Sequence, residues 1–258
     1  MASIPHPPHA VLVPFPSQGH VNPLMHFAKL LAARGFFVTF INTNWMEHRI
    51  FKAPNDAAAL SHQLQHQGLQ IRFLALPDGL PPDHRRAQAM VEYFQAMQKS
   101  GPAMVRLLQS VGNVEVPPIT CIVSSCFMSC TLQVATSLAV PRVVFWTYCT
   151  SAAIVLANCR MLVEKGYIPI NLKEARRPEN LITCLPGNIP PLWPTDLPTA
   201  FRVEDTADST FQLMMYESEI QDKADYVLIN VFEELEGPQA AEGLSKGYPA
   251  LPIGPRLP

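Results

Sequence analysis

Residues 10–42 read AVLVPFPSQGHVNPLMHFAKLLAARGFFVTFIN. The apolar run Ala10–Phe15 predicts a buried strand, and Phe36–Asn42, rich in aromatic and β-branched residues, predicts a second one. Between them, Asn22 is the expected N-cap of a helix whose first residue is Pro23. A strand, a helix and a strand within about 30 residues form a βαβ unit, which requires parallel strands and a right-handed crossover.

The same alternation continues along the chain. Further strands are predicted over Ile71–Leu76, Ile119–Ser124, Arg142–Thr147 and Tyr226–Val231. Further helices are predicted over Arg86–Ser100, Pro102–Val111, Phe127–Leu138, Ser151–Lys165 and Asp208–Lys223. The proline-rich stretch Asn171–Thr199 predicts a long irregular excursion. Together these patterns predict an α/β protein with a Rossmann-like, doubly wound and mainly parallel sheet, helices on both faces, and a single domain over residues 1–258.

This fold class has one position where a ligand site is expected. In the common strand order 3-2-1-4-5, the first and fourth strands are neighbours and the order reverses between them. Ligands bind outside the carboxyl ends of two such strands. We therefore expect His20, which follows the first strand, to lie near Ser125 and Cys126, which follow the fourth.

His20 is a candidate general base, with an ordinary loop histidine as the alternative. A catalytic imidazole needs an acceptor that orients its other ring nitrogen, commonly a carboxylate. The end of the fourth predicted strand, Val123–Phe127, contains no carboxylate. Ser124 or Ser125 could serve there as the N-cap of the following helix. The sequence thus offers a base without its usual partner.

Two other kinds of chemistry are conceivable at the same place. No G-x-G-x-x-G follows the first strand, where Gly19 is the only glycine, so the dinucleotide fingerprint is absent. Backbone N–H groups of Ser17–Gly19, close to a helix start, can still accept a phosphate. A Ser–His or Cys–His nucleophile pair would make a hydrolase, but Ser125 lacks the glycine-flanked elbow and Cys126 fits a buried core position equally well.

The composition excludes several classes of protein. The chain of 258 residues is 48% hydrophobic and 16% charged, with a formal charge of −2, so no basic surface for nucleic acid is expected. No apolar run reaches the ~20 residues that a membrane-spanning helix needs, and the N-terminus lacks the features of a signal peptide. Without an export signal, the six cysteines are expected to be reduced thiols, and a cytoplasmic location is expected. The cysteines do not show metal-ligand spacing, so no metal site is expected.

Several short motifs follow one another in order along the chain. They are P-x-Q-G-H-x-x-P at Pro16–Pro23, Thr120–Ser124, Pro141–Thr147, Pro186-Gly187, Asp196–Pro198, Val227–Glu236 and Pro252–Pro255. In sequence and in order, this set resembles the plant family 1 UDP-glycosyltransferases. The resemblance implies the GT-B architecture, in which two Rossmann-like domains face a cleft. The chain is similar to the first of these domains, which binds the acceptor.

The resemblance also implies roles for residues at the cleft. His20 matches the histidine that deprotonates the acceptor hydroxyl, whose oxygen then attacks the anomeric carbon of the sugar with inversion. Thr147 matches a threonine that often contacts the transferred sugar. Ser17, Gln18 and Gly19 match the loop near the phosphates of the donor.

The chain departs from the family pattern at two points. Ser125 stands where the family has the aspartate that orients the histidine, and a neutral serine stabilises an imidazolium less than a carboxylate does. The chain also stops at Pro258, and its last segment, 252–258, resembles the start of the linker to the donor-binding domain. We therefore expect the isolated chain to have weak activity or none.

The expected ligands follow from the family. The co-substrate is a UDP-sugar, with glucose expected, the acceptor is a small lipophilic hydroxylated metabolite, and no cofactor or metal is needed. Phe94, Phe127, Tyr148 and Phe201 are candidates to line the acceptor pocket, although aromatic residues most often belong to the core. The excursion and the helix after it are expected to wall this pocket. The alternative is a non-catalytic module that binds a small molecule or a partner, such as a separate donor-binding domain.

Overall fold

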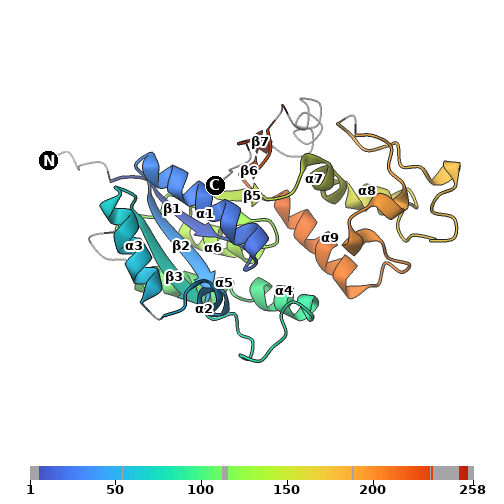
Figure 1. Cartoon of the computed structure of the whole chain (residues 1–258). Helices are drawn as coiled ribbons and strands as arrows, with labels where there is room; N and C mark the ends of the chain where they lie inside the picture. The colour runs from blue at the N-terminus through green and yellow to red at the C-terminus, as the bar shows by residue number, and fades with distance from the viewer. Residues whose placement is uncertain are drawn as a thin grey trace. The chain divides into compact units, whose positions relative to one another are not determined.

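The computed structural model describes residues 6–53, 55–111, 116–187, 189–232, 234 and 250–254 (Figure 1). Contacts group the chain into two compact units, one within Met1–Thr147 and one within Tyr148–Pro255. Both units combine strands and helices, in keeping with the predicted α/β class. Whether the two units act as one domain stays a prediction.

The first unit is a parallel sheet with helices packed on it. Its strands are β1 (His9–Val13), β2 (Phe37–Thr43), β3 (Ile71–Leu76), β4 (Cys121–Ser125) and β5 (Arg142–Trp146). Its helices are α1 (Gln18–Ala33), α2 (Asn44–Ile50), α3 (Asp56–His66), α4 (Met90–Gln98), α5 (Gly101–Ser110) and α6 (Cys130–Leu138). Each neighbouring strand pair is parallel, in the order β3-β2-β1-β4-β5. This order confirms the predicted doubly wound fold.

The central strand β1 is buried on both faces. Ala10, Val11 and Leu12 have no exposed surface. Helix α1 packs against β2 and β3, whereas α5 packs against α6, and Figure 1 shows α1 on one face of the sheet with α5 and α6 on the other. A strand covered on both faces reads as a continuous apolar run rather than as an alternating pattern. This is why the sequence identifies β1 so readily.

The first helix begins one turn earlier than predicted. The expected N-cap Asn22 lies inside α1, which begins at Gln18 with Ser17 as its N-cap. The N–H of His20 donates to the Ser17 carbonyl at 3.0 Å, so a helical turn has formed before Pro23 is reached. The prediction was wrong because Pro23 was assigned to the first helical position, whereas it lies within the helix. As a result, His20 belongs to the first turn of α1 instead of the loop before it.

Two other helices begin later than predicted. The helix expected from Arg86 begins at Met90, because the Arg86 side chain is held ahead of the helix by an ion pair with Asp78. The helix expected from Phe127 begins at Cys130, because Phe127 has a φ of 71°, in the left-handed region where an α-helix cannot continue. Arg86 and Phe127 therefore lie in connecting segments that lead into helices.

Two helices between β2 and β3 had no counterpart in the sequence analysis. Helix α2 follows β2 at once, and its N-cap Thr43 accepts the N–H of Met46 through Oγ1 at 3.2 Å. This cap satisfies a backbone donor that the start of α2 leaves without a partner. Asp56 is the first residue of α3, and its Oδ2 accepts the N–H groups of Lys52 and Ala53 in the segment before the helix, both at 2.9 Å.

The second unit contains helices and a parallel strand pair. Its elements are α7 (Thr150–Ala157), α8 (Cys159–Glu164), α9 (Ser209–Gln221), β6 (Tyr226–Ile229) and β7 (Ala250–Pro252), with β6 and β7 parallel. The single helix predicted over Ser151–Lys165 is divided at Asn158. The Asn158 Nδ2 donates to the Ile154 carbonyl at 2.8 Å, a local side-chain bond that competes with the helical backbone pattern.

The Pro-rich excursion of the second unit is irregular but ordered. It contains 3₁₀ turns at Pro178–Asn180, Pro194–Asp196 and Thr199–Phe201, and an isolated bridge joins Ile182 to Leu192. The predicted linker start over 252–258 is described only as far as Gly254, so residues 255–258 lie outside the described chain.

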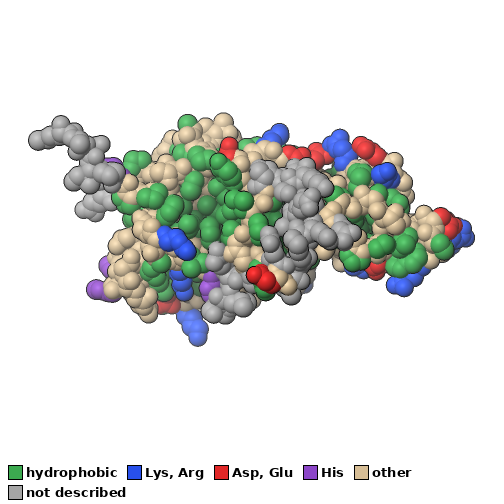
Figure 2. All heavy atoms as spheres, turned by 90° about the horizontal axis from the view of Figure 1, so that it is seen from above, with side chains coloured by type: hydrophobic (Ala, Val, Ile, Leu, Met, Phe, Trp, Pro, Cys, Tyr) green, Lys and Arg blue, Asp and Glu red, His purple; other side chains and the backbone are tan. Residues whose placement is uncertain are grey.

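The visible surface carries charges of both signs. In Figure 2, acidic and basic side chains lie close together on the second unit, which also contains the exposed ion pairs Arg160–Glu219 and Arg177–Glu174. No helix in the described ranges is long and apolar enough to cross a membrane.

Candidate active site

The candidate base lies where β1 ends and α1 begins. The segment Pro14–Ser17 joins the two elements, and the Ser17 N–H donates to the Phe15 carbonyl at 2.7 Å, which closes a tight turn. Gln18 and Gly19 follow on the surface, and a Cβ added to Gly19 would meet no atom within 4 Å. The first N–H groups of α1 have no partner within the helix, so this open position can accept an anion.

His20 itself is buried among aromatic rings. Its side chain is 8% exposed, and its ring centroid lies 5.5 Å from that of Phe15 and 6.0 Å from that of Phe127. Thr147, directly after β5, places its Oγ1 3.5 Å from His20 Nδ1. Burial lowers the pKa of His20 to about 4, because the charged imidazolium loses its hydration there. At neutral pH the imidazole is therefore uncharged, as a proton acceptor must be.

Ser125 has a structural partner in the loop after β1. Its Oγ, fully buried, accepts the N–H of Phe15 at 2.5 Å. Neighbouring Ser124 bonds to Thr131, whose Oγ1 lies 2.9 Å from the Ser124 Oγ. Neither serine acts as the N-cap of α6, since that position belongs to Ser129. The capping alternative for these serines is therefore wrong, and the Ser125 hydroxyl joins the end of β4 to the turn that leads to His20.

The predicted pocket aromatics fall into different units. In the first unit, Phe94 and Phe127 pack edge to face with centroids 5.3 Å apart, and Phe94 stacks on Phe15 at 4.5 Å. In the second unit, Phe201 is 1% exposed and packs against Phe211, while Tyr148 is partly exposed. Phe94 and Phe127 therefore share one aromatic cluster with the candidate base. The assignment of all four residues to an acceptor pocket stays a prediction.

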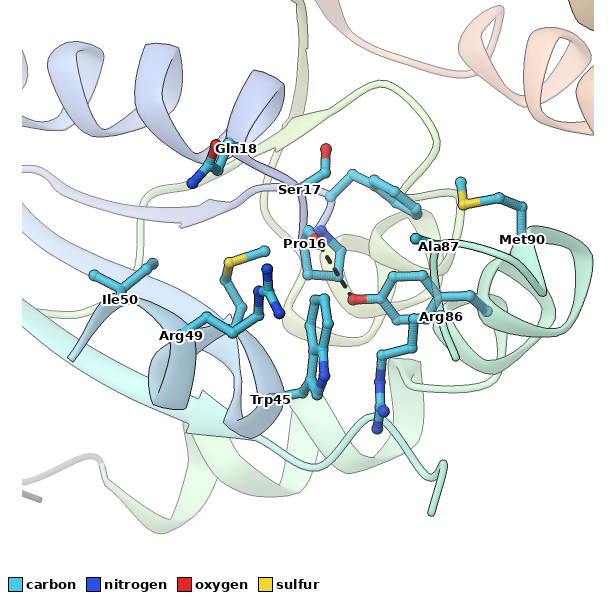
Figure 3. Close-up of a pocket in the computed structure, with 12 residues that line it drawn as sticks. Pro16, Ser17, Gln18, Trp45, Arg49, Ile50, Arg86, Ala87 and Met90 are labelled. Atoms are coloured by element: carbon cyan, nitrogen blue, oxygen red, sulfur yellow. Dashed lines mark hydrogen bonds between the residues drawn. The ribbon is translucent and has the colours of Figure 1, made fainter. Parts of the chain in front are cut away.

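A pocket of about 520 Å³ opens beside the loop after β1 (Figure 3). Ser17 and Gln18 line it from the loop, Trp45 and Arg49 from α2, and Arg86 from the segment before α4. The wall formed by the loop is held to α4, because the Tyr93 hydroxyl donates to the Pro16 carbonyl at 3.2 Å. Phe15 lines this pocket and also contacts the His20 ring, so one aromatic side chain lies between the pocket and the candidate base.

Most residues of this pocket were missed by the sequence analysis. Trp45 and Arg49 lie on α2, a helix that was not predicted, and Arg86 was assigned to the start of a helix. One sequence signal was available, since Thr43 before an Asn-Trp-Met-Glu run is an N-cap followed by a helix-compatible segment. That Trp45, Arg49 and Arg86 line one cavity, however, depends on the order of the strands in the sheet and not on local sequence.

No metal site or covalent nucleophile emerges from the described residues. Within them, no group of three or more His, Cys, Asp or Glu side chains could hold a metal ion. Cys126 is 2% exposed, and its N–H donates to the Phe145 carbonyl at 3.2 Å. A thiol so deeply buried is a core side chain rather than an accessible nucleophile. The hydrolase alternative therefore gains no support from the geometry.

Comparison with known sequences identifies relatives of this chain. Residues 9–179 match the family described as "Glycosyltransferase, N-terminal domain". The 7-deoxyloganetin glucosyltransferase of Catharanthus roseus is 32% identical over 268 residues, covering 96% of this chain and 51% of that protein. The (R)-mandelonitrile beta-glucosyltransferase of Prunus dulcis is 34% identical over 258 residues, with the same coverage of 96% and 51%. The chain thus spans about half the length of the curated relatives it matches.

Solved structures share the fold. Medicago truncatula UGT71G1, complexed with UDP-glucose, matches with a TM-score of 0.76 at 18% identity, over 100% of this chain and 54% of that one. Phytolacca americana UGT2, complexed with UDP-2fluoro-glucose and pterostilbene, matches with a TM-score of 0.73 at 22% identity, over 97% and 55%. The family match, the curated relatives and the shared fold show that this chain belongs to the plant family 1 UDP-glycosyltransferases and corresponds to their N-terminal half.

Proposed function

We propose that this chain is the acceptor-binding half of an enzyme that transfers a sugar from a UDP-sugar to a hydroxyl of a small lipophilic metabolite. Glucose is the proposed sugar, because the relatives from Catharanthus roseus and Prunus dulcis are named as glucosyltransferases. The proposed reaction needs two substrates and no metal. The observation that carries the proposal is the position of His20, uncharged and buried at the start of α1 beside an open pocket.

The proposed mechanism is a single displacement. His20 takes the proton of the acceptor hydroxyl as the oxygen forms a bond to the anomeric carbon of the sugar. The bond between that carbon and the β-phosphate oxygen breaks, UDP leaves with the electron pair, and the configuration inverts. General base catalysis of this kind contributes about 10²–10⁴ in rate. The low pKa of His20, about 4, keeps the base deprotonated but makes it weak.

Thr147 is the proposed positioning residue for this base. Its Oγ1 lies 3.5 Å from His20 Nδ1, which is long for a hydrogen bond. A group at Nδ1 can orient the ring, while Nε2 takes the proton of the acceptor. A hydroxyl can fix the ring without supplying the negative charge that would stabilise an imidazolium. Since Ser125 is also neutral and bonds to the Phe15 N–H, we expect slower turnover than a carboxylate at position 125 would allow.

The direct test restores a donor-binding half. The chain would be fused to the C-terminal half of the Catharanthus roseus relative, and UDP release from UDP-glucose would be measured with a panel of phenolic and terpenoid alcohols. Acceptor-dependent UDP release, together with a glucosylated product by mass spectrometry, is the expected result. The chain alone and the C-terminal half alone are the controls, and neither should match the fusion.

A second candidate function is a non-catalytic module that binds a small molecule. It is favoured by Ser125, which is neutral and bonds to the turn before the base. On this alternative, acceptors bind to the fused protein, but UDP release stays at the background of the His20→Ala variant. Isothermal titration calorimetry beside the UDP assay therefore separates the two functions.

A further inference from the structure

The pocket beside the loop after β1 contains two arginines with different surroundings. Arg86 is 3% exposed, and its charge is balanced by Asp78, with Nε–Oδ2 at 2.7 Å and Nη2–Oδ1 at 3.0 Å. It also donates to the carbonyls of His84 and Leu80, at 3.1 and 3.3 Å. A bidentate pair of this kind leaves little capacity to bind a ligand anion. The positive charge of Arg86 is therefore used within the fold.

Arg49 has no such partner. It is exposed on α2, and among the residues that the structure describes no carboxylate lies within 4.0 Å of its guanidinium. Its guanidinium carbon instead lies 4.9 Å from the centre of the Trp45 ring, while that of Arg86 lies 5.1 Å from the same ring. Figure 3 shows Trp45 between these two side chains. Arg49 is thus held at the pocket wall with its charge unbalanced.

The same pocket has an apolar rim. Ile50 is 43% exposed and Met90 38% exposed, and both line the cavity that Arg49 lines. Large apolar side chains left in water beside a fixed guanidinium fit a ligand with an apolar body and an anionic group. The Tyr93 hydroxyl already donates to the Pro16 carbonyl, so it offers the pocket an acceptor only.

We propose that Arg49 selects acceptors that are lipophilic hydroxy acids, by pairing with their carboxylate while the apolar body lies against Ile50 and Met90. This inference rests on the proposed function, because it takes this pocket to be where the acceptor enters. The hydroxyl that receives the sugar would then point toward the side of the pocket closed by Phe15, whose ring contacts His20. The donor diphosphate is the other source of a negative charge, and the test must separate the two.

The test compares an acid with its neutral ester. Isothermal titration calorimetry would measure the binding of 4-hydroxycinnamic acid and of its methyl ester to the full chain, and to Arg49→Gln, Arg49→Lys and Arg34→Gln variants. Arg34 is an exposed arginine at the opposite end of α1 and serves as the matched control. The acid should bind about tenfold more tightly than the ester, as expected for a charge-assisted contact at an open site. In Arg49→Gln the acid and the ester should bind with equal affinity. Arg49→Lys should keep most of the tenfold preference for the acid, and Arg34→Gln should keep all of it.

Two results would overturn the inference: equal affinities for acid and ester, or an unchanged ratio of the two affinities in Arg49→Gln. UDP would be titrated in the same way, and a loss of UDP affinity in Arg49→Gln together with an unchanged ratio would assign Arg49 to the donor phosphates. A ratio that shrinks at high salt would support the ion pair, since an exposed pair is screened. Because these measurements need no turnover, they can fail while UDP release by the fused enzyme succeeds, and the reverse also holds.

Discussion

Two buried histidines lie at opposite edges of the same sheet. His9 begins β1 at the amino edge, and both of its ring nitrogens have close partners: Nδ1 lies 2.7 Å from the Pro117 carbonyl and Nε2 lies 2.7 Å from Thr39 Oγ1. His20 follows the carboxyl end of β1, and its contact with Thr147 Oγ1 is 3.5 Å. Burial lowers the pKa of both histidines.

The network around His9 determines its protonation. A carbonyl can only accept, so Nδ1 carries the proton and donates to Pro117. In the neutral ring, Nε2 must then accept from the Thr39 hydroxyl, whose oxygen in turn accepts from Arg72 Nε at 2.7 Å. This ring has no lone pair left for a substrate. Burial alone therefore does not mark a histidine as catalytic, since His9 is fully buried and both of its ring nitrogens are engaged within the fold.

The largest expected effect concerns turnover. In the fused two-domain enzyme, His20→Ala should lower kcat by about 10²–10⁴, because the acceptor proton loses its base. His9→Gln should keep kcat per folded molecule within about twofold. Steady-state UDP release, normalised to the folded fraction by circular dichroism, makes the comparison. Equal losses in both variants would remove the distinction between the two edges.

The next effect concerns stability in acid. The pKa of His20 is about 4 in the folded chain, against 6.5 for the unfolded chain, so the unfolded state binds more protons between these values and stability falls as the pH falls. This lowering of the His20 pKa corresponds to about 3 kcal/mol of folding free energy lost between pH 7 and pH 4. Urea unfolding at pH 7 and pH 4 should show this loss of unfolding free energy in the native chain. In His20→Gln, the loss between the two pH values should be smaller by about 3 kcal/mol.

A smaller effect is expected at the amino edge. His9→Ala should lower the free energy of unfolding by about 2 kcal/mol, because it leaves the Pro117 carbonyl and the Thr39 hydroxyl without their partner in a buried site. Urea denaturation at pH 7 gives the value. His9→Gln, measured in parallel, keeps a polar side chain at this position and should cost less. A loss below about 0.5 kcal/mol in His9→Ala would contradict the structural role of His9.

The smallest effect concerns Ser125. Ser125→Asp should raise the His20 pKa and raise kcat of the fused enzyme by about tenfold, because a nearby carboxylate stabilises the imidazolium that forms during proton transfer. Ser125→Asn is the matched neutral control and should give no gain. An NMR titration of the His20 ring measures the pKa. If the pKa rises and the rate does not, charging of His20 is not what limits turnover.

Much of the fold is readable from local sequence. Buried parallel strands are continuous apolar runs, so β1 to β5 were located within a few residues, and their order followed from general rules of α/β topology. Helix boundaries were less accurate. Pro23 was assigned to a helix start although it lies inside α1, and Asn158 divides a predicted helix by a side-chain bond that spacing does not show.

The sequence by itself determined the fold class, the family resemblance and the candidate base, because apolar runs and the motif around His20 are local features of the chain. Topology rules already placed Ser125 near that base, but only the tertiary structure decided which contacts the surrounding groups make. Three residues that follow or end later strands contact the segment after β1, because parallel strands end at a common edge of the sheet. They are Ser125, Phe127 and Thr147, each 105 or more residues from His20 along the chain. The pocket of Trp45, Arg49 and Arg86 has the same origin, since its walls are distant segments that come together only when the sheet has formed.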